Sequence, residues 1–129
     1  MSSRGANIDS LKFLRELVAK FRDERNWLMY HNPKDLAISI MIEAAELLEL
    51  FQWRSEEEVK ELVTSKVFIE KIQREMADIL IYLLSLADVL NIDLGKAVIR
   101  KLKENSAKYP PEEVSGEKFR EILNRRLNL

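Results

Sequence analysis

The chain has 129 residues, of which 47% are hydrophobic and 33% are charged, and its formal net charge is −1. This balance is typical of one folded domain with a core, and it excludes the broad basic surface of most nucleic-acid-binding proteins. The absence of cysteine excludes disulfides, thiolate metal sites and thiol nucleophiles. Residues 1–10 are polar and lack a signal-peptide pattern, and the longest apolar run, residues 76–90, is too short to span a membrane. We therefore expect a cytoplasmic protein that binds neither nucleic acid nor membrane.

Only three glycines and three prolines interrupt the chain, which favours helices joined by short connections. N-cap residues mark several helix starts, among them Ser10 or Asp9, Asn32 before Pro33, and Ser55 paired with Glu58. The periodicity predicts helices over residues 10–25, 33–53, 55–64, 67–90 and from the break at 91–93 to about 109. The four principal helices predict an all-α fold with a four-helix bundle-like core that oligomerises through helices.

The predicted organisation is a flexible N-terminal tail over residues 1–9 and one domain over residues 10–111. Two consecutive prolines, Pro110 and Pro111, end the last long helix. Residues 112–129 are expected to form a short helix or a partly ordered tail.

Two pairs of carboxylates repeat one spacing on two predicted helices. Glu43 and Glu46 lie three residues apart in the apolar stretch IEAAELLELFQW, and Glu75 and Asp78 repeat this spacing in REMADILIYLL. Residues three apart share one helix face, so two such helices packed side by side would bring four carboxylates together. Four hard oxygen donors without His or Cys suit Mg²⁺, with Mn²⁺ as a substitute.

Charged residues on a helix more often form a solvated face, and this alternative stays open for each carboxylate. Lys71 and Arg74 each precede an acid of the second pair by four residues, which allows surface ion pairs worth about 0.3–0.5 kcal/mol. The first pair has no basic residue three or four positions away. Burying unpaired carboxylates is costly, and a bound cation would remove that cost. Glu49 is either a further ligand, an outer group of the site or an exposed glutamate.

Aromatic side chains share faces with these carboxylates. Tyr82 follows Asp78 by four residues, and Trp53 follows Glu46 by seven on the same predicted face. Aromatic rings beside a divalent cation could stack on a nucleobase, although most such rings are ordinary core residues.

The last long helix carries a polar, basic face formed by Lys101, Asn105 and Lys108. Such a face is suited to phosphate oxygens, and it is equally compatible with simple solvation.

The motifs occur in a fixed order. They are F-x-x-E-R-x-W, H-x-P-x-x-L, E-x-x-E-L-x-E-L-F-Q-W, EMADILIYLLSLAD and K-x-x-x-N-x-x-K-Y-P, and they cover about residues 10–111. A lone ExxE motif is a weak signal, but the ordered set is specific. The set resembles the all-α nucleoside triphosphate pyrophosphohydrolases, the MazG-like group, and within it the dCTP pyrophosphatase branch.

This resemblance implies cleavage of nucleoside triphosphates between the α and β phosphates by an activated water, giving a monophosphate and pyrophosphate. It implies a helical bundle that pairs, often into tetramers, so that one pocket is built from more than one subunit. The implied Mg²⁺ ligands are Glu43, Glu46, Glu75 and Asp78, and Glu46 or Glu49 is the candidate to orient or deprotonate the water. The implied substrate-binding residues are Lys101, Asn105, Lys108 and Tyr109 for the phosphates, and Trp27, Trp53 and Tyr82, with His31 nearby, for the nucleotide pocket.

Two positions depart from the wider family pattern. Ala44 stands where many members have a second glutamate, and the dCTP branch tolerates this change. Val18 stands where some branch members have a histidine near the base, which weighs against a strict cytosine preference. His31, the only histidine, is either a pocket residue or a side chain of the cap region before Asn32.

Three functional hypotheses follow. The first is a pyrophosphohydrolase that cleans the dNTP pool, with dCTP-like substrates favoured. The second is a non-catalytic helical interaction module whose carboxylates lie on a solvated or partner-binding face. The third is a metal-dependent phosphohydrolase of another pyrophosphate-containing molecule.

Overall fold

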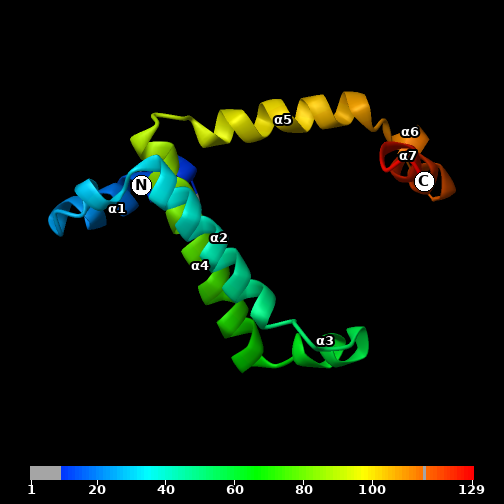
Figure 1. The fold of residues 1–129 in the computed structure, drawn as a ribbon, viewed down its shortest axis with the longest axis horizontal. Coiled ribbons are helices and arrows are strands. Elements are labelled where there is room, and N and C mark those ends of the chain that lie inside the picture. The colour runs from blue at the N-terminus through cyan, green and yellow to red at the C-terminus, as the bar shows by residue number, and fades with distance from the viewer. Residues whose placement is uncertain (1–9, 115) are drawn as a thin grey trace, which may run out of the picture. The chain divides into compact units, whose positions relative to one another are not determined.

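The computed structural model describes residues 10–114 and 116–129, and every regular element in these ranges is a helix, which confirms the all-α prediction (Figure 1). The chain divides into two compact units at Ile92 and Asp93. The first unit contains α1 (Leu11–Glu24), the short 3₁₀ helix η1 (Leu28–Tyr30), α2 (Pro33–Glu49), α3 (Glu56–Leu62) and α4 (Lys66–Val89). The second contains α5 (Leu94–Lys108), α6 (Pro111–Val114) and α7 (Glu117–Arg126). The predicted tail over residues 1–9 lies outside the described residues.

The helix starts follow the local capping chemistry. The hydroxyl oxygen of Ser10 accepts a hydrogen bond from the Phe13 backbone N–H at 3.1 Å, and the Asn32 side-chain oxygen accepts one from the Asp35 N–H at 2.9 Å. Ser55 Oγ accepts from the Glu58 N–H at 3.1 Å. Because these bonds satisfy N–H groups that have no partner inside the helix, sequence alone could locate the starts.

The predicted end of the second long helix is wrong. We expected this helix to reach Trp53, but α2 ends at Glu49 and the chain turns through residues 50–53. Trp53 has a φ of +68°, which no helical residue adopts, and its side chain is 92% exposed. Trp53 therefore does not extend the helix face that carries Glu46.

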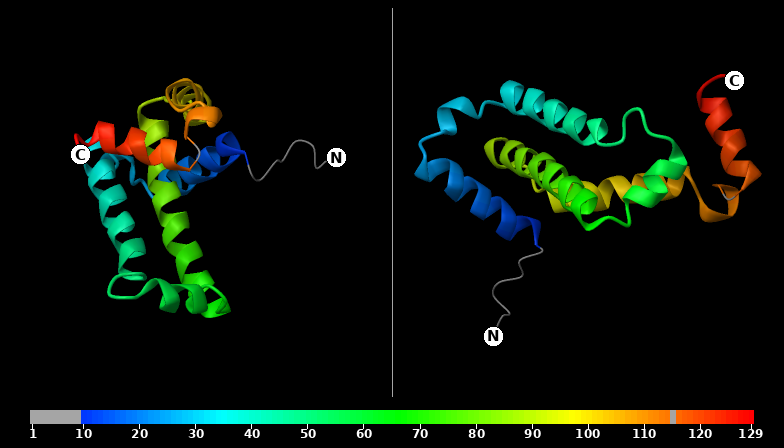
Figure 2. Two further views of the ribbon diagram at one scale, coloured as in Figure 1. Left: turned by 90° about the vertical axis from the view of Figure 1, so that its right-hand side faces the viewer. Right: turned by 90° about the horizontal axis from the view of Figure 1, so that it is seen from below.

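The core of the first unit lies where α4 packs against both α1 and α2. Figures 1 and 2 show α2 and α4 side by side and running in opposite directions. The buried apolar side chains are Leu36, Phe68, Leu84 and Ala87. On α2 the less exposed positions recur at helical spacing, and they include Leu36, Ile40, Glu43 and Leu47. Glu43 therefore occupies a position of the stripe that packs toward α4.

A charged clamp ties α1 to the end of α4. The Arg22 guanidinium, only 6% exposed, donates to Asp88 Oδ2 at 2.8 Å and to the Asp23 carboxylate at 2.9 Å. Arg15 donates to Asp88 Oδ1 at 3.1 Å and to the Ile92 carbonyl at 2.9 Å. Burial acts to raise the pKa of Asp88, but the hydrogen bonds from Arg22 and Arg15 outweigh it and hold that pKa below its ordinary value.

No helix in the described part of the chain has both the length and the apolar character needed to cross a membrane.

Candidate functional site

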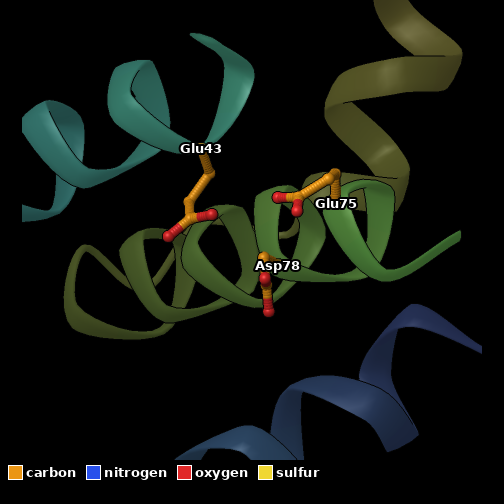
Figure 3. Close-up of side chains that lie close together, drawn as sticks. All are labelled: Glu43, Glu75 and Asp78. Carbon is orange, nitrogen blue, oxygen red and sulfur yellow. The ribbon is translucent and has the colours of Figure 1, made fainter. Parts of the chain in front are cut away.

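Three carboxylates from two helices converge between α2 and α4. Glu43 on α2 and Glu75 and Asp78 on α4 each offer one oxygen, and these oxygens all lie within 4.8 Å of one another. Figure 3 shows Glu43 extending from α2 toward α4, where Glu75 and Asp78 stand one helical turn apart. The i, i+3 spacing on α4 and the packing of α2 against α4 together produce the cluster. Glu46, the fourth acid of the two motifs, lies outside this group of three.

The cluster has no cationic partner in the described residues. None of the salt bridges found there involves Glu43, Glu75 or Asp78, so the ion pairs considered with Lys71 and Arg74 do not form. The Oε2 atoms of Glu43 and Glu75 are buried and have no hydrogen-bond partner among the residues that the structure describes. Buried polar atoms are normally satisfied, so these two orphaned oxygens are suited to binding a cation.

The electrostatics of the cluster also favour the binding of a positive charge. Interaction with the Glu46 carboxyl, followed by burial and the charges of the neighbouring acids, raises the pKa of Glu43 to about 7. Burial and the Glu46 carboxyl raise the pKa of Glu75 as well. Crowded carboxylates take up a proton because like charges cannot all remain ionised at short distance.

A divalent cation fits this arrangement. Carboxylate oxygens are hard donors of the kind that oxygen-binding divalent ions prefer, and the cluster contains neither thiolate nor imidazole. A bound cation would supply the partner that both orphaned oxygens lack. The three carboxylates therefore form a group able to hold a divalent metal ion.

The raised pKa of Glu43 predicts that, with divalent metal ions removed by a chelator, the free energy of unfolding falls as pH rises. Between pH 4.5, its ordinary pKa, and about 7, the folded protein binds more protons at Glu43 than the unfolded chain, so stability falls as pH rises through this window. The lowered pKa of His31 makes the folded protein gain stability as pH rises below pH 6.5, which opposes the effect of Glu43. The comparison therefore uses a variant that keeps this histidine. Urea unfolding at pH 5 and 7.5 in EDTA should show the wild type losing stability relative to Glu43→Gln. Parallel pH profiles of the two proteins would contradict the expectation.

An aromatic cavity lies on the same two helices. Its volume is about 270 Å³, and it is lined by Trp27, Tyr30, His31, Asp35, Leu36, Ser39 and Tyr82. Tyr82 follows Asp78 by one turn of α4, and Ser39 precedes Glu43 by one turn of α2. The cavity therefore neighbours the carboxylate cluster along both helices.

His31 lines this cavity, where its surroundings disfavour the protonated ring. Burial, reinforced by the positive charge of Arg22, lowers the pKa of His31. Its Nδ1 atom is buried and has no hydrogen-bond partner in the described residues. Of the two alternatives considered for His31, the structure shows it lining the cavity.

The remaining predicted residues divide between the two units. Glu49 is exposed at the end of α2, and Trp53 does not line the cavity. Lys101 lies on α5 and pairs with Glu104 at 3.5 Å on an exposed surface, and Asn105 is half-buried on the same helix. The ammonium of Lys108 lies 5.7 Å from the centre of the Tyr109 ring, and the buried Tyr109 hydroxyl has no hydrogen-bond partner within residues 10–114 and 116–129.

The chain matches the model of the MazG-like family over residues 38–121, which is more than half of its length. The chain belongs to the MazG-like family. A pyrophosphatase from Archaeoglobus fulgidus of known crystal structure is 48% identical, with a TM-score of 0.71 over 78% of this chain and 92% of that one. This MazG-like chain is thus similar in both sequence and fold to a solved pyrophosphatase.

Two mammalian proteins are also similar in sequence to this chain. The proteins named dCTP pyrophosphatase 1 from Rattus norvegicus and Homo sapiens are 39% and 38% identical over 101 residues, or 78% of this chain. This MazG-like chain spans 59% of the length of each of these relatives. The resemblance to the MazG-like family identified from the ordered motifs is confirmed, and these relatives carry the name of the dCTP pyrophosphatase branch.

Sequence reasoning missed four residues that line the cavity, namely Tyr30, Asp35, Leu36 and Ser39. A signal for two of them was present, because Asp35, Ser39 and Glu43 recur at i, i+4 and i+8 along α2. Tyr30 gave no such signal, since it belongs to a short 3₁₀ helix that periodicity did not predict.

Proposed function

We propose that this chain is a Mg²⁺-dependent pyrophosphohydrolase that cleaves dNTPs, dCTP foremost, into a monophosphate and pyrophosphate. One observation supports this function above the others. A cluster of unpaired carboxylates and an aromatic cavity adjoin on the same faces of α2 and α4. This is the arrangement that a nucleotide needs, with a cation site for its phosphates beside an apolar site for its base. The names of the mammalian relatives point to the same substrate.

We assign the metal to Glu43, Glu75 and Asp78, with Glu46 as a fourth ligand. Mg²⁺ is the proposed ion and Mn²⁺ a substitute, because both prefer carboxylate oxygens. When bound, Mg²⁺ supplies charge that offsets the negative phosphate oxygens during cleavage.

The chain's own side chains position the other participants. Glu46 is the proposed acceptor of a proton from the attacking water, since its carboxyl interacts with both Glu43 and Glu75. Glu49, one turn further along α2, is assigned a supporting role at the water. Trp27 and Tyr82 would hold the base in the cavity, with His31 beside it. The resemblance assigns phosphate contacts to Lys101, Asn105, Lys108 and Tyr109.

The exposed apolar surface supports assembly into homo-oligomers. One face of α2 presents Ile38, Met41 and Leu48 to solvent, with exposed fractions of 47%, 70% and 61%. Exposed apolar patches of this kind mark interaction sites because burying them against a partner removes apolar surface from water. Trp53, at 92% exposure, is assigned to the nucleotide pocket of a second subunit.

A charge placed on this face should separate the subunits. Met41→Glu is expected to lower the molar mass measured by light scattering after size exclusion, because burying an unpaired carboxylate is strongly unfavourable. Gln73→Glu adds the same charge at an exposed polar position of α4 and is expected to leave the mass unchanged. A wild-type chain of monomer mass would contradict the assembly.

A cytoplasmic location, where the dNTP pool is held, fits this house-cleaning role. The decisive experiment incubates the purified protein with the four dNTPs and CTP, with and without Mg²⁺, and separates the products by chromatography. Monophosphate and pyrophosphate from dCTP above the other nucleotides is the expected result. Release of orthophosphate would favour a different phosphohydrolase, and no turnover by a folded protein would favour an interaction module.

A further inference from the structure

Asp35 is the one acidic side chain among the residues that line the aromatic cavity. It lies in the first turn of α2 and lines the cavity together with Trp27, Tyr82 and His31. The carboxylate cluster does not account for Asp35, which precedes Glu43 by eight residues, or about 12 Å along the helix axis. The helices α2 and α4 run in opposite directions (Figure 1). Tyr82 follows Asp78 by one turn of α4, so it lies on the same side of the cluster as Asp35, and both line the cavity. A nucleotide with its phosphates at the cluster would extend its base toward Asp35.

The Asp35 carboxylate is held in place and keeps one oxygen free to accept. Its Oδ2 accepts a hydrogen bond from the Asn32 side-chain amide at 2.7 Å, and its backbone N–H donates to Asn32 Oδ1 at 2.9 Å. No Lys, Arg or His forms an ion pair with Asp35 in the described part of the chain. An ionised carboxylate only accepts hydrogen bonds, so its free oxygen selects a donor.

We propose that Asp35 determines base specificity by accepting a hydrogen bond from the exocyclic amino group of the base. This inference rests on the proposed function and names the determinant within it. Cytosine carries an amino donor where uracil carries a carbonyl acceptor, and a carboxylate is the side chain that pairs with this amine. Opposite uracil, two acceptors would face each other without a proton between them. Adenine also carries an exocyclic amine, so Asp35 selects amino bases as a class, and the size of the cavity decides between them.

The cavity contains a second polar feature that fits a base edge. The buried Nδ1 atom of His31 has no partner in the described residues. An apolar cavity with a few fixed polar groups is the usual form of a specific small-molecule site. Asp35 and His31 therefore supply the polar contacts, and Trp27 and Tyr82 supply stacking surface.

The test compares kcat/KM for dCTP and dUTP in Mg²⁺, because these two nucleotides differ only at the base edge. The wild type should prefer dCTP by about tenfold or more. Asp35→Asn should reduce this ratio at least tenfold, because its amide can turn a donor toward the uracil carbonyl while its oxygen keeps the Asn32 contact. Asp35→Ala should lose dCTP activity without gaining dUTP activity. Glu57→Gln makes the same carboxylate-to-amide change in the first turn of α3, outside the cavity, and should keep the wild-type ratio.

The outcomes separate this inference from the proposed function. If the wild type hydrolyses neither nucleotide, the proposed function fails. If the wild type turns over both equally, or Asp35→Asn keeps the wild-type ratio, the enzyme stands and the role of Asp35 is wrong. A carboxylate that served only the start of α2 would change the unfolding midpoint of Asp35→Asn and leave the ratio of the two nucleotides unaltered.

Discussion

Replacing Glu43 with glutamine should lower Mg²⁺-dependent turnover by on the order of a thousandfold while leaving the helical fold intact. Glutamine has nearly the same shape, but it removes the negative charge that pairs with a cation. Glu43 is also the one member of the group of three that comes from α2, so its loss leaves Glu75, Asp78 and the proposed fourth ligand Glu46 to hold the ion. The measurement is initial-rate hydrolysis of dCTP across a Mg²⁺ titration, with far-UV circular dichroism as the test of fold.

The control for this variant is Glu57→Gln, which makes the same change on α3 outside the cluster. It should retain wild-type turnover and wild-type Mg²⁺ dependence. Because Glu43 carries a raised pKa, the glutamine variant should also be at least as stable as the wild type in chelator at pH 7.5. Wild-type turnover by Glu43→Gln would overturn both the metal assignment and the proposed function.

Replacing Arg22 with methionine should lower the free energy of unfolding by about 2–4 kcal/mol. Methionine keeps much of the apolar stem but removes the guanidinium that donates to Asp88 and Asp23. The Arg22 side chain is 7% exposed and that of Asp88 is 25% exposed, so the carboxylate would lose its closer partner at a largely buried site. Urea unfolding at one fixed protein concentration measures the change, since the proposed assembly would also contribute to stability.

Arg15→Met is the matched control for the clamp. Arg15 also donates to Asp88, but its side chain is 24% exposed and its removal leaves the shorter Arg22 contact intact. The expected loss is about 1 kcal/mol. Equal losses for the two variants would show that both arginines matter alike, and an unchanged midpoint for Arg22→Met would show that Arg15 alone satisfies Asp88.

The sequence by itself determined the features that depend on neighbours within a few residues. Asn32 and Ser55 were identified as helix caps, and Ser10 as one of two candidates, because the N–H groups they satisfy lie three residues away. The i, i+3 spacing put Glu75 and Asp78 on one face of α4 for the same reason. The all-α class followed from periodicity and from the scarcity of glycine and proline.

Only the tertiary structure decided the contacts between distant segments. Arg22 and Asp88 are separated by 66 positions, and nothing local to either residue predicts their pairing. The early end of α2 also escaped prediction, because LELFQW has helix-compatible residues throughout and only the turn toward α3, with Trp53 at positive φ, ends the helix. The packing of α2 against α4 brings Glu43 to Glu75 and Asp78 and leaves Glu46 outside that group of three. The same packing places Asp35 and Tyr82 at one cavity. Helix periodicity gives each side chain a face, but it cannot say which face of another helix will meet it, since that is set by how the whole core excludes water.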